Sequence, residues 1–267
     1  MNEQLKRLNE RMDELTKKNV CIAFSGGVDS SLLLKTAAMA AEKNRTQVYA
    51  VTISTRLQPW EETEHAQKVA RECGVEHHIL AIDESRNEDI LKNSTERCYW
   101  CKRFLFQALK SWAGLHSADY ILEGSNADDR KMYRPGLRAI EELGVFSPLA
   151  ELGITKQEVR QMAHELGIST ASRPAAPCMA TRLPYGTPLD FEAMERLAKG
   201  EQEMREMGFD VVRLRLHGDI VRVEVAKEKL SDALNQRRDI TEMLRTLGFR
   251  YITLDLEGFR SGSMDLW

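Results

Sequence analysis

A glycine loop set between a buried strand and a helix, AFSGGVDSSLLL at residues 23–34, constrains this chain more than any other stretch. The apolar run VCIAF (20–24) leads straight into the loop, and the helical pattern SLLLKTAAMAAEK (31–43) follows it. Two glycines let backbone N–H groups turn toward a common point, and the helix N-terminus adds positive charge there. The loop is therefore predicted to bind an anion at the carboxyl end of a strand.

The loop differs from the two commonest phosphate-binding fingerprints. It contains neither the GxxxxGK[ST] pattern nor the GxGxxG pattern. Asp29 would repel a phosphate unless a divalent cation lay between them, so the loop implies Mg²⁺. The alternative interpretation is an ordinary glycine-containing turn between a strand and a helix.

The rest of the first part of the chain repeats the alternation of strand and helix. Strands are expected at 47–54, 77–83 and 120–125, and the stretches between them are helical. This alternation indicates an α/β fold with a doubly wound parallel sheet, whose ligand sits at the carboxyl ends of the strands. A further helix is expected at 155–167, with Thr155 as its N-cap.

The pattern changes after about residue 183. A helix is expected over 189–207, then the two strands of DVVRLRLHGDIVRVEV, one long helix, and a last strand within 249–259. We therefore predict two domains, residues 1–183 and a smaller α+β domain of residues 184–267.

Charge and composition exclude several classes of protein. Lys and Arg total 38 against 41 for Asp and Glu, which argues against a surface built wholly to grip nucleic acid. No apolar run approaches the roughly 18 residues of a membrane span, and the N-terminus lacks a signal-peptide core. We expect a cytoplasmic protein with reduced thiols, and the odd count of 5 cysteines makes a disulfide framework a poor interpretation.

Cys98 and Cys101 lie in CYWCK, and Cys178 lies far downstream in PCMATRLPYG. On a helix, Cys98 and Cys101 would share one face, so both sulfurs could meet one metal. Three thiolates on a 4Fe–4S cluster would leave one iron open, whereas a structural zinc site wants four ligands. A redox or persulfide pair and plain packing are the alternatives. Cys21 and Cys73 are predicted to be buried packing residues.

Polar residues gather after the fourth predicted strand, in LEGSNADDRKMYRPG. Carboxylates there can hold Mg²⁺ against phosphates, and an arginine can reach a phosphate or the substrate. A solvated polar loop is the alternative. The candidates are Glu123, Asn126, Asp128, Asp129 and Arg134, together with Lys102, which follows Cys101 directly.

The second domain contains a predicted β-hairpin with Gly218-Asp219 as its two-residue turn. This register places Arg215 opposite Arg222 and Arg213 opposite Glu224, all on the polar face. Like charges directly opposite each other destabilise a sheet, so an anion between the arginines is expected. An ordinary solvated face with one salt bridge is the alternative.

The SGGVDS loop resembles the PP-loop of the ATP pyrophosphatase superfamily, whose members cleave ATP between the α and β phosphates. The resemblance implies that residues 1–183 form a PP-loop domain and that the loop cradles the leaving pyrophosphate. The implied nucleotide-binding residues of the loop are Ser25, Gly26, Gly27, Asp29 and Ser30.

Further stretches narrow the resemblance to the LarE family of sulfur transferases, and it covers nearly the whole chain. The stretches that carry it are CYWCKRFLF (98–106), LEGSNADDRKMYRPGLRA (122–139), PCMATRLPYG (177–186), VRLRLHGDIVRVEV (212–225) and FRYITLDLEGFRSG (249–262). The resemblance implies ATP-dependent conversion of a carboxylate of pyridinium-3,5-biscarboxylic acid mononucleotide to a thiocarboxylate, in synthesis of the nickel-pincer cofactor of lactate racemase. It also implies a small-molecule nucleotide substrate, neighbouring enzymes of that pathway as partners, and a homo-oligomer, often a hexamer in the family. The substrate-binding positions that it implies are Arg182, Glu201, Arg213, Arg215 and Glu224, with Asp232 on a further acidic position.

In many family members the cysteine matching Cys178 gives up its own sulfur. This chain departs from them by also carrying Cys98 and Cys101, and it resembles members whose three cysteines hold an iron–sulfur cluster. The alternatives are a tRNA-thiolating enzyme, an amide-forming synthetase and a nucleotide-binding regulator without chemistry. No zinc-finger pattern or net positive charge supports tRNA binding, and no nucleophilic N-terminal cysteine supports amide synthesis.

Overall fold

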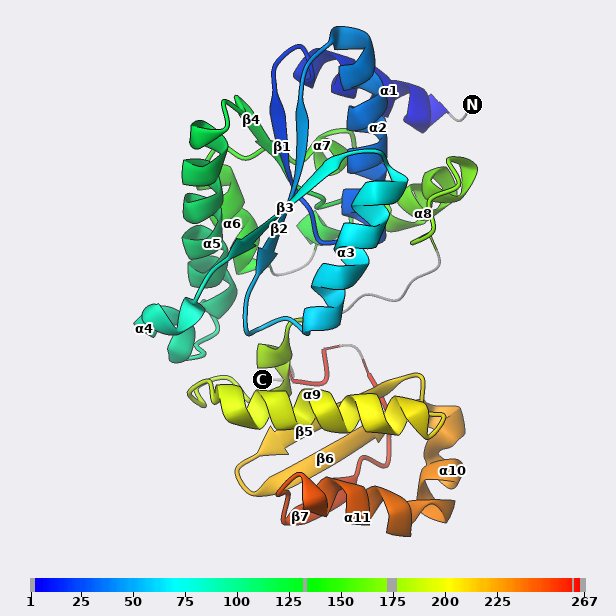
Figure 1. Cartoon of the computed structure of the whole chain (residues 1–267). Helices are drawn as coiled ribbons and strands as arrows, with labels where there is room; N and C mark the ends of the chain where they lie inside the picture. Colours follow the sequence, from blue (N-terminus) through cyan, green and yellow to red (C-terminus); the bar gives the residue numbers. More distant parts are fainter. Residues whose placement is uncertain (1–2, 132–133, 172–176, 261, 265–267) are drawn as a thin grey trace. The chain divides into compact units, whose positions relative to one another are not determined.

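The computed structural model describes residues 3–131, 134–171, 177–260 and 262–264. The chain divides into two compact units, drawn in Figure 1. The first unit comprises residues 1–90 and 96–176, and the second comprises residues 91–95 and 177–267. The predicted boundary at residue 183 thus lies within the second unit, a few residues after its start at Pro177.

The first unit begins with an alternation of helix and strand that runs as far as β3, and ends with consecutive helices. Its elements are α1 (Glu3–Leu15), β1 (Val20–Ala23), α2 (Val28–Asn44), β2 (Val48–Ser54), α3 (Trp60–Glu72), β3 (Glu76–Ala81), α4 (Glu88–Leu91), α5 (Arg97–Leu115), β4 (Tyr120–Leu122), α6 (Pro135–Glu142), α7 (Pro148–Glu151) and α8 (Lys156–Glu165). The strands form one parallel sheet in the order β3-β2-β1-β4. This confirms the doubly wound α/β fold.

Helices cover both faces of this sheet, as Figure 1 shows. On one face, α1, α2 and α8 pack on β1 and β2, and the predicted stripe Leu5, Leu8, Met12 and Leu15 of α1 is buried there. On the other face, α5 and α6 pack through Phe106, Leu109 and Ile140. Thr155 caps α8 as expected, in a capping box with Glu158. Apolar burial on both faces accounts for the near-continuous apolar strands.

The second unit is a small α+β unit. It contains the 3₁₀ turn η3 (Met179–Arg182), α9 (Phe191–Glu206), β5 (Val212–His217), β6 (Ile220–Val225), α10 (Leu230–Asn235), α11 (Arg237–Thr246) and β7 (Tyr251–Leu254). Strands β5 and β6 pair antiparallel in the predicted register, and β7 pairs parallel to β6.

Two features of the second unit differ from the sequence expectation. The single long helix is wrong, because the chain turns at Gln236 and forms α10 and α11. The apolar spacing continues from Ala233 to Ile240, so only Asn235, a poor helix former, hints at the break. Residues 91–95 also belong to this unit, because Asn93 donates to the carbonyls of Pro184 and Thr187, each at 2.9 Å.

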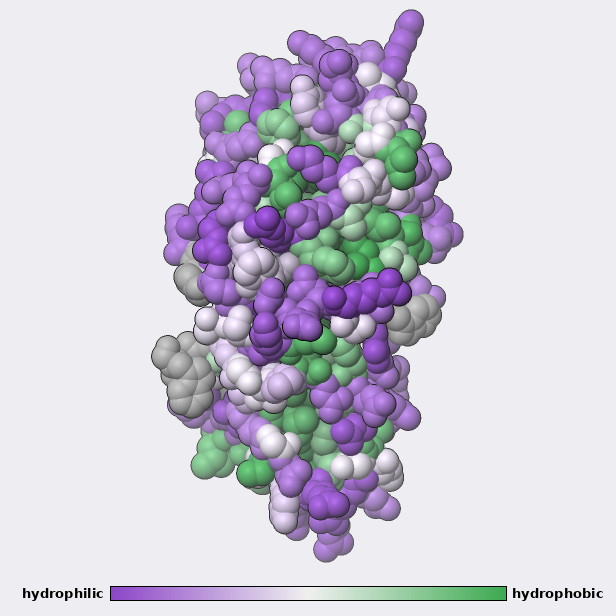
Figure 2. Space-filling model, turned by 90° about the vertical axis from the view of Figure 1, so that its left-hand side faces the viewer, coloured by the Kyte–Doolittle hydropathy of each residue, from purple (hydrophilic) through white to green (hydrophobic). Residues whose placement is uncertain are grey.

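The surface face drawn in Figure 2 is mainly hydrophilic, with local patches of hydrophobic side chains. Among the described residues, no helix has both the length and the apolar character that crossing a membrane requires.

Candidate nucleotide site and second-unit arginine cluster

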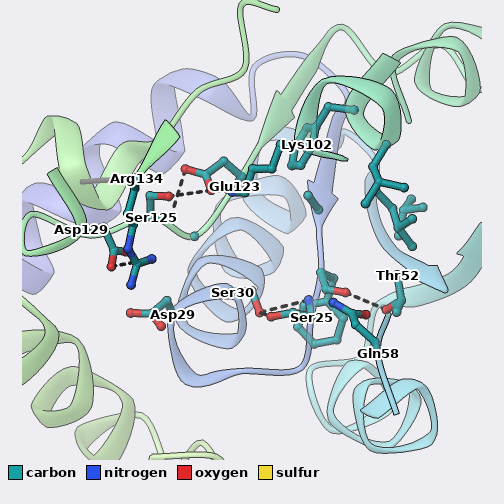
Figure 3. A pocket seen from close by; sticks show the side chains of 17 residues that line it. Ser25, Asp29, Ser30, Thr52, Gln58, Lys102, Glu123, Ser125, Asp129 and Arg134 are labelled. Atoms are coloured by element: carbon teal, nitrogen blue, oxygen red, sulfur yellow. Dashed lines mark hydrogen bonds and ion pairs between the residues drawn. The ribbon is translucent and has the colours of Figure 1, made fainter. Parts of the chain in front are cut away.

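A cavity of about 320 Å³ lies at the carboxyl ends of β1, β2 and β4. Strand order reverses between β1 and β4, and open parallel sheets bind ligands at such a point. Figure 3 shows the polar side chains that converge on the cavity. Its lining includes the loop residues Ser25, Asp29 and Ser30, the β2 residues Val51, Thr52 and Ile53, and Lys102, Leu105, Phe106, Glu123, Asp129 and Arg134.

The glycine loop is shaped by backbone requirements. Gly26 has φ +70°, and a Cβ there would lie 2.8 Å from the Cα of Ala66 in α3, so only glycine fits. Gly27 is the N-cap of α2 and offers no side chain to cap it, which leaves the first-turn N–H groups for an anion. Ser30 Oγ lies 3.1 Å from Ser25 Oγ and donates to the carbonyl of Gly27 at 3.1 Å, which braces the loop.

Asp29 is engaged by two residues from outside the loop. Its carboxylate forms an ion pair with Lys156 at the start of α8, and it accepts a hydrogen bond from Asn126 Nδ2 at 3.1 Å. The structure thus brings together Asp29 and Asn126, as the sequence suggested. Lys156 was missed, because nothing local distinguishes it from a solvated lysine.

Glu123 is buried at the end of β4 and holds a second ion pair. Its carboxylate lies 3.6 Å from Lys102 Nζ and accepts hydrogen bonds from Ser125 and Ser147. Lys102 and Glu123 therefore meet across the cavity, as Figure 3 shows. Gly124 follows Glu123, and a Cβ there would lie 3.0 Å from the backbone nitrogen of Ser30. The β4 end is thus held directly against the glycine loop.

Asp129 and Arg134 form a third ion pair at the cavity wall, with 2.9 Å between Arg134 Nη1 and Asp129 Oδ1. Asp128 instead accepts from the backbone N–H of Lys156 at 2.9 Å, and this bond and Lys131 lower the pKa of its carboxyl. Asp128 is absent from the cavity lining, so its part in the site is to position α8.

One wall of the cavity is apolar and was not predicted. It contains Val51, Ile53, Leu105 and Phe106, from β2 and α5. Beside it, Thr52 Oγ1 donates to the carbonyl of Phe24 at 2.7 Å and lies 2.7 Å from His77 Nε2. Because the hydroxyl proton of Thr52 is already committed to Phe24, Nε2 of His77 must carry the proton of that contact. The sequence pattern of a buried strand predicts Val51 and Ile53 only as core residues, not as the wall of a cavity.

The donor set of the cavity fits a magnesium ion that also binds phosphates. Asp29, Glu123 and Asp129 present carboxylate oxygens, the ligands that Mg²⁺ prefers. Each is paired with a cation here, and the described residues contain no group of three or more His, Cys, Asp or Glu placed to hold a metal alone. Mg²⁺ usually takes one or two carboxylates and completes its shell with phosphate and water, so such a group is not required.

All five cysteines lie in described parts of the chain, and none forms a disulfide. Cys98 lies in the first turn of α5 and Cys101 follows at the start of the second. Cys98 is exposed and accepts a hydrogen bond from Arg97 at 3.7 Å. Cys178 is the residue before η3 and is half-buried. Cys21 is fully buried, as expected, and burial raises the pKa of its thiol to about 12. Cys73 is half-buried, and burial raises its pKa also.

In the second unit, Arg182 and Glu201 form a buried bidentate pair. Arg182 Nε lies 2.7 Å from Glu201 Oε1 and Nη2 lies 2.8 Å from Oε2. Glu201 also accepts from the backbone N–H of Leu214 at 3.0 Å, which ties α9 to the edge of β5. Asp232 is half-buried and pairs with Lys229, within the turn that starts α10.

The hairpin face places a carboxylate between two arginines. Glu224 is fully buried, and its two oxygens lie 3.2 Å from Arg215 Nη2 and 3.1 Å from Arg222 Nη2. Glu224 therefore supplies a negative charge between the opposed arginines from within the protein, so their opposition does not by itself require a bound phosphate. The solvated-face alternative is wrong for Arg215 and Glu224, because both are buried. Arg213 differs, because no carboxylate lies within ion-pair distance of it among the described residues. Burial and the positive charge of Arg182 lower the pKa of Arg213.

Comparison with known proteins places these sites in context. Residues 1–139 match the family described as PP-loop domain. The pyridinium-3,5-bisthiocarboxylic acid mononucleotide synthase of Lactiplantibacillus plantarum is 36% identical, over 93% of this chain and 89% of its own. An uncharacterised protein of Synechocystis is 36% identical over 99% of this chain and 98% of its own. A tRNA-specific 2-thiouridylase of Acetivibrio thermocellus is 27% identical over only 60% of this chain and 55% of its own.

Proposed function

Because this chain belongs to the PP-loop family, we propose that it is an ATP-dependent sulfur transferase acting on pyridinium-3,5-biscarboxylic acid mononucleotide. The observation that carries the proposal is the 36% identity to a synthase of the corresponding bisthiocarboxylic acid over 93% of this chain. That similarity includes the second unit as well as the nucleotide site. A tRNA-thiolating relative matches a smaller share of the chain, so it is weaker evidence for the substrate of this protein.

ATP binds in the cavity at the carboxyl edge of the sheet. The apolar wall of Val51, Ile53, Leu105 and Phe106 accommodates the adenine ring, and the glycine loop takes the polyphosphate at the N-terminus of α2. Asp29 and Asp129 would hold Mg²⁺, which supplies charge neutralisation at the phosphates. Lys156 and Arg134 lie beside these two carboxylates, Lys102 lies beside Glu123, and all three add positive charge.

Adenylation makes the substitution of sulfur for oxygen feasible. A substrate carboxylate oxygen attacks the α-phosphorus of ATP, and pyrophosphate leaves against the glycine loop. Sulfide then attacks the activated carbonyl carbon, and AMP departs with the original oxygen. Without that leaving group, displacement of a carboxylate oxygen at neutral pH would be far too slow.

The mononucleotide phosphate binds to the hairpin of the second unit. Arg213 is the best-placed residue, because it is half-buried and its charge has no acidic partner within ion-pair distance among the described residues. Arg215 has its charge matched by Glu224 and contributes a donor to the carbonyl of Thr181 at 2.8 Å. Arg182, Glu201 and Glu224 act by holding this face together.

The sulfur is carried by Cys98, Cys101 and Cys178. The exposure of Cys98 and the thiol chemistry of all three fit a 4Fe–4S cluster, which would bind and deliver sulfide. The competing route is sacrifice of Cys178. We place the enzyme in the cytoplasm as a homo-oligomer, beside the other enzymes of nickel-pincer cofactor synthesis.

Anaerobic purification followed by iron analysis and intact-mass measurement after turnover distinguishes the two sulfur routes. We expect bound iron, many turnovers with added sulfide, and loss of iron in each of the single Cys→Ser variants of Cys98, Cys101 and Cys178. Cys73→Ser is the matched control and should keep its iron. Full sulfur transfer by a Cys98→Ser, Cys101→Ser double variant, with one turnover and loss of the mass of H₂S, would establish sacrifice of Cys178.

A further inference from the structure

The C-terminal segment after β7 lies against the arginine face of the hairpin. Phe259 donates its backbone N–H to the carbonyl of Val225, the last residue of β6, at 2.8 Å. Just before it, Gly258 has φ +69°, and a Cβ there would lie 2.8 Å from the same carbonyl oxygen. Only glycine can make this approach, so Gly258 determines where the segment that follows it runs. Figure 1 draws this part of the chain in red.

Two side chains of the segment contact the hairpin charges. The ring of Phe259 lies under the guanidinium of Arg213, with 5.4 Å from the central carbon to the ring centroid. Ser263 Oγ donates to Glu224 Oε1 at 2.8 Å. Arg222 reaches the sulfur of Met264 at 3.5 Å, so the same segment also contacts the arginine across the ladder.

The arginines of this face have partners of different kinds. Arg215 and Arg222 are held by Glu224, a carboxylate. Arg213 is held by the face of an aromatic ring and by a hydrogen bond from Nη1 to the carbonyl of Val212 at 2.6 Å. A ring face fixes the orientation of a guanidinium without neutralising it, so the charge stays available to a bound anion.

We propose that Phe259 and Ser263 are positioning residues for the phosphate of the mononucleotide substrate. Phe259 holds Arg213 in its binding orientation, and Ser263 fixes Glu224, which in turn holds Arg215. The inference rests on the proposed function, because it presumes that this face binds the substrate phosphate. It extends the site to Phe259 and Ser263, to which the sequence patterns assigned no role.

The test compares KM for the mononucleotide with KM for ATP, using pyrophosphate release, in Phe259→Leu, Phe259→Tyr and Ser263→Ala variants. Phe259→Leu should raise the mononucleotide KM about fivefold, equivalent to about 1 kcal/mol for a cation–π contact. Phe259→Tyr keeps the ring face and should restore the wild-type value, and Ser263→Ala should also raise this KM. The ATP KM should stay unchanged in all three. Leu256→Ala, at an 87% exposed side chain of the same segment, is the matched control.

A purely structural role for Phe259 would lower the melting temperature and shift both KM values together, which overturns the inference. If Arg213→Ala raises the mononucleotide KM but Phe259→Leu does not, the inference fails while the proposed phosphate site stands. If Arg213→Ala leaves that KM unchanged, the phosphate site and the inference both fail.

Discussion

Arg182→Met should destabilise the protein strongly, because Arg182 and Glu201 are each only 3% exposed and form a bidentate pair. Removing the arginine leaves the buried carboxylate of Glu201 with only the half-exposed guanidinium of Arg205, 3.9 Å away, to match its charge. Loss of one partner of a buried ion pair costs about 3–5 kcal/mol, a large part of the roughly 5–15 kcal/mol that stabilises a typical domain. Glu201 also accepts a hydrogen bond from the backbone N–H of Leu214 at 3.0 Å, which compensates only part of the carboxylate's charge.

Urea unfolding followed by circular dichroism measures this cost. A double variant, Arg182→Met with Glu201→Leu, is the matched comparison, because replacing both charges with apolar groups of similar volume is often neutral. We expect the double variant to recover most of the stability that the single variant loses. A single variant that loses less than about 0.5 kcal/mol, the usual range for a surface substitution, would refute the inference that the pair is buried and structural.

Three further predictions follow from the first unit. Asp29→Asn should reduce Mg²⁺-dependent pyrophosphate release well over tenfold, or about 1.4 kcal/mol of barrier, and unchanged turnover would mean that the metal is held elsewhere. Burial raises the pKa of the Glu84 carboxyl in the folded protein above its ordinary 4.5. Protonation of Glu84 therefore contributes fully to the free energy of unfolding below pH 4.5, and this contribution is lost as the pH rises through the raised pKa of the folded state. Unfolding in urea at several pH values should therefore show wild type losing stability relative to Glu84→Gln as pH rises, and parallel curves would contradict this. Gly26→Ala should abolish ATP binding in calorimetry, whereas Gly144→Ala, with φ +68° but nothing within 4 Å of its Cβ, should not; equal binding by both would show that contact with Ala66 is unimportant.

The sequence specified the first unit well because its signals are local. Strands β1, β2 and β4 are apolar runs that end in a loop, and helical sequence patterns fill the stretches between the strands. The hairpin register was predicted as well, because a two-residue turn at Gly218-Asp219 leaves only one pairing for the charges that flank it.

The features that the sequence did not specify depend on contacts between distant segments. Lys156 meets Asp29 across 127 positions, and only the packing of α8 against α2 brings them together. Likewise, residues 91–95 join the second unit through the side chain of Asn93, which no periodicity reveals. The C-terminal segment also contacts the hairpin charges, through Ser263 and Met264, and nothing in its sequence indicates that contact.

Mass spectrometry of the mononucleotide after turnover shows whether sulfur has entered the substrate. The protein is incubated anaerobically with ATP, Mg²⁺, sulfide and pyridinium-3,5-biscarboxylic acid mononucleotide. We expect a product whose mass shows sulfur in place of a carboxylate oxygen, with AMP and pyrophosphate formed in equal amount. An unchanged mononucleotide, or ATP cleaved to ADP and orthophosphate, would contradict this expectation.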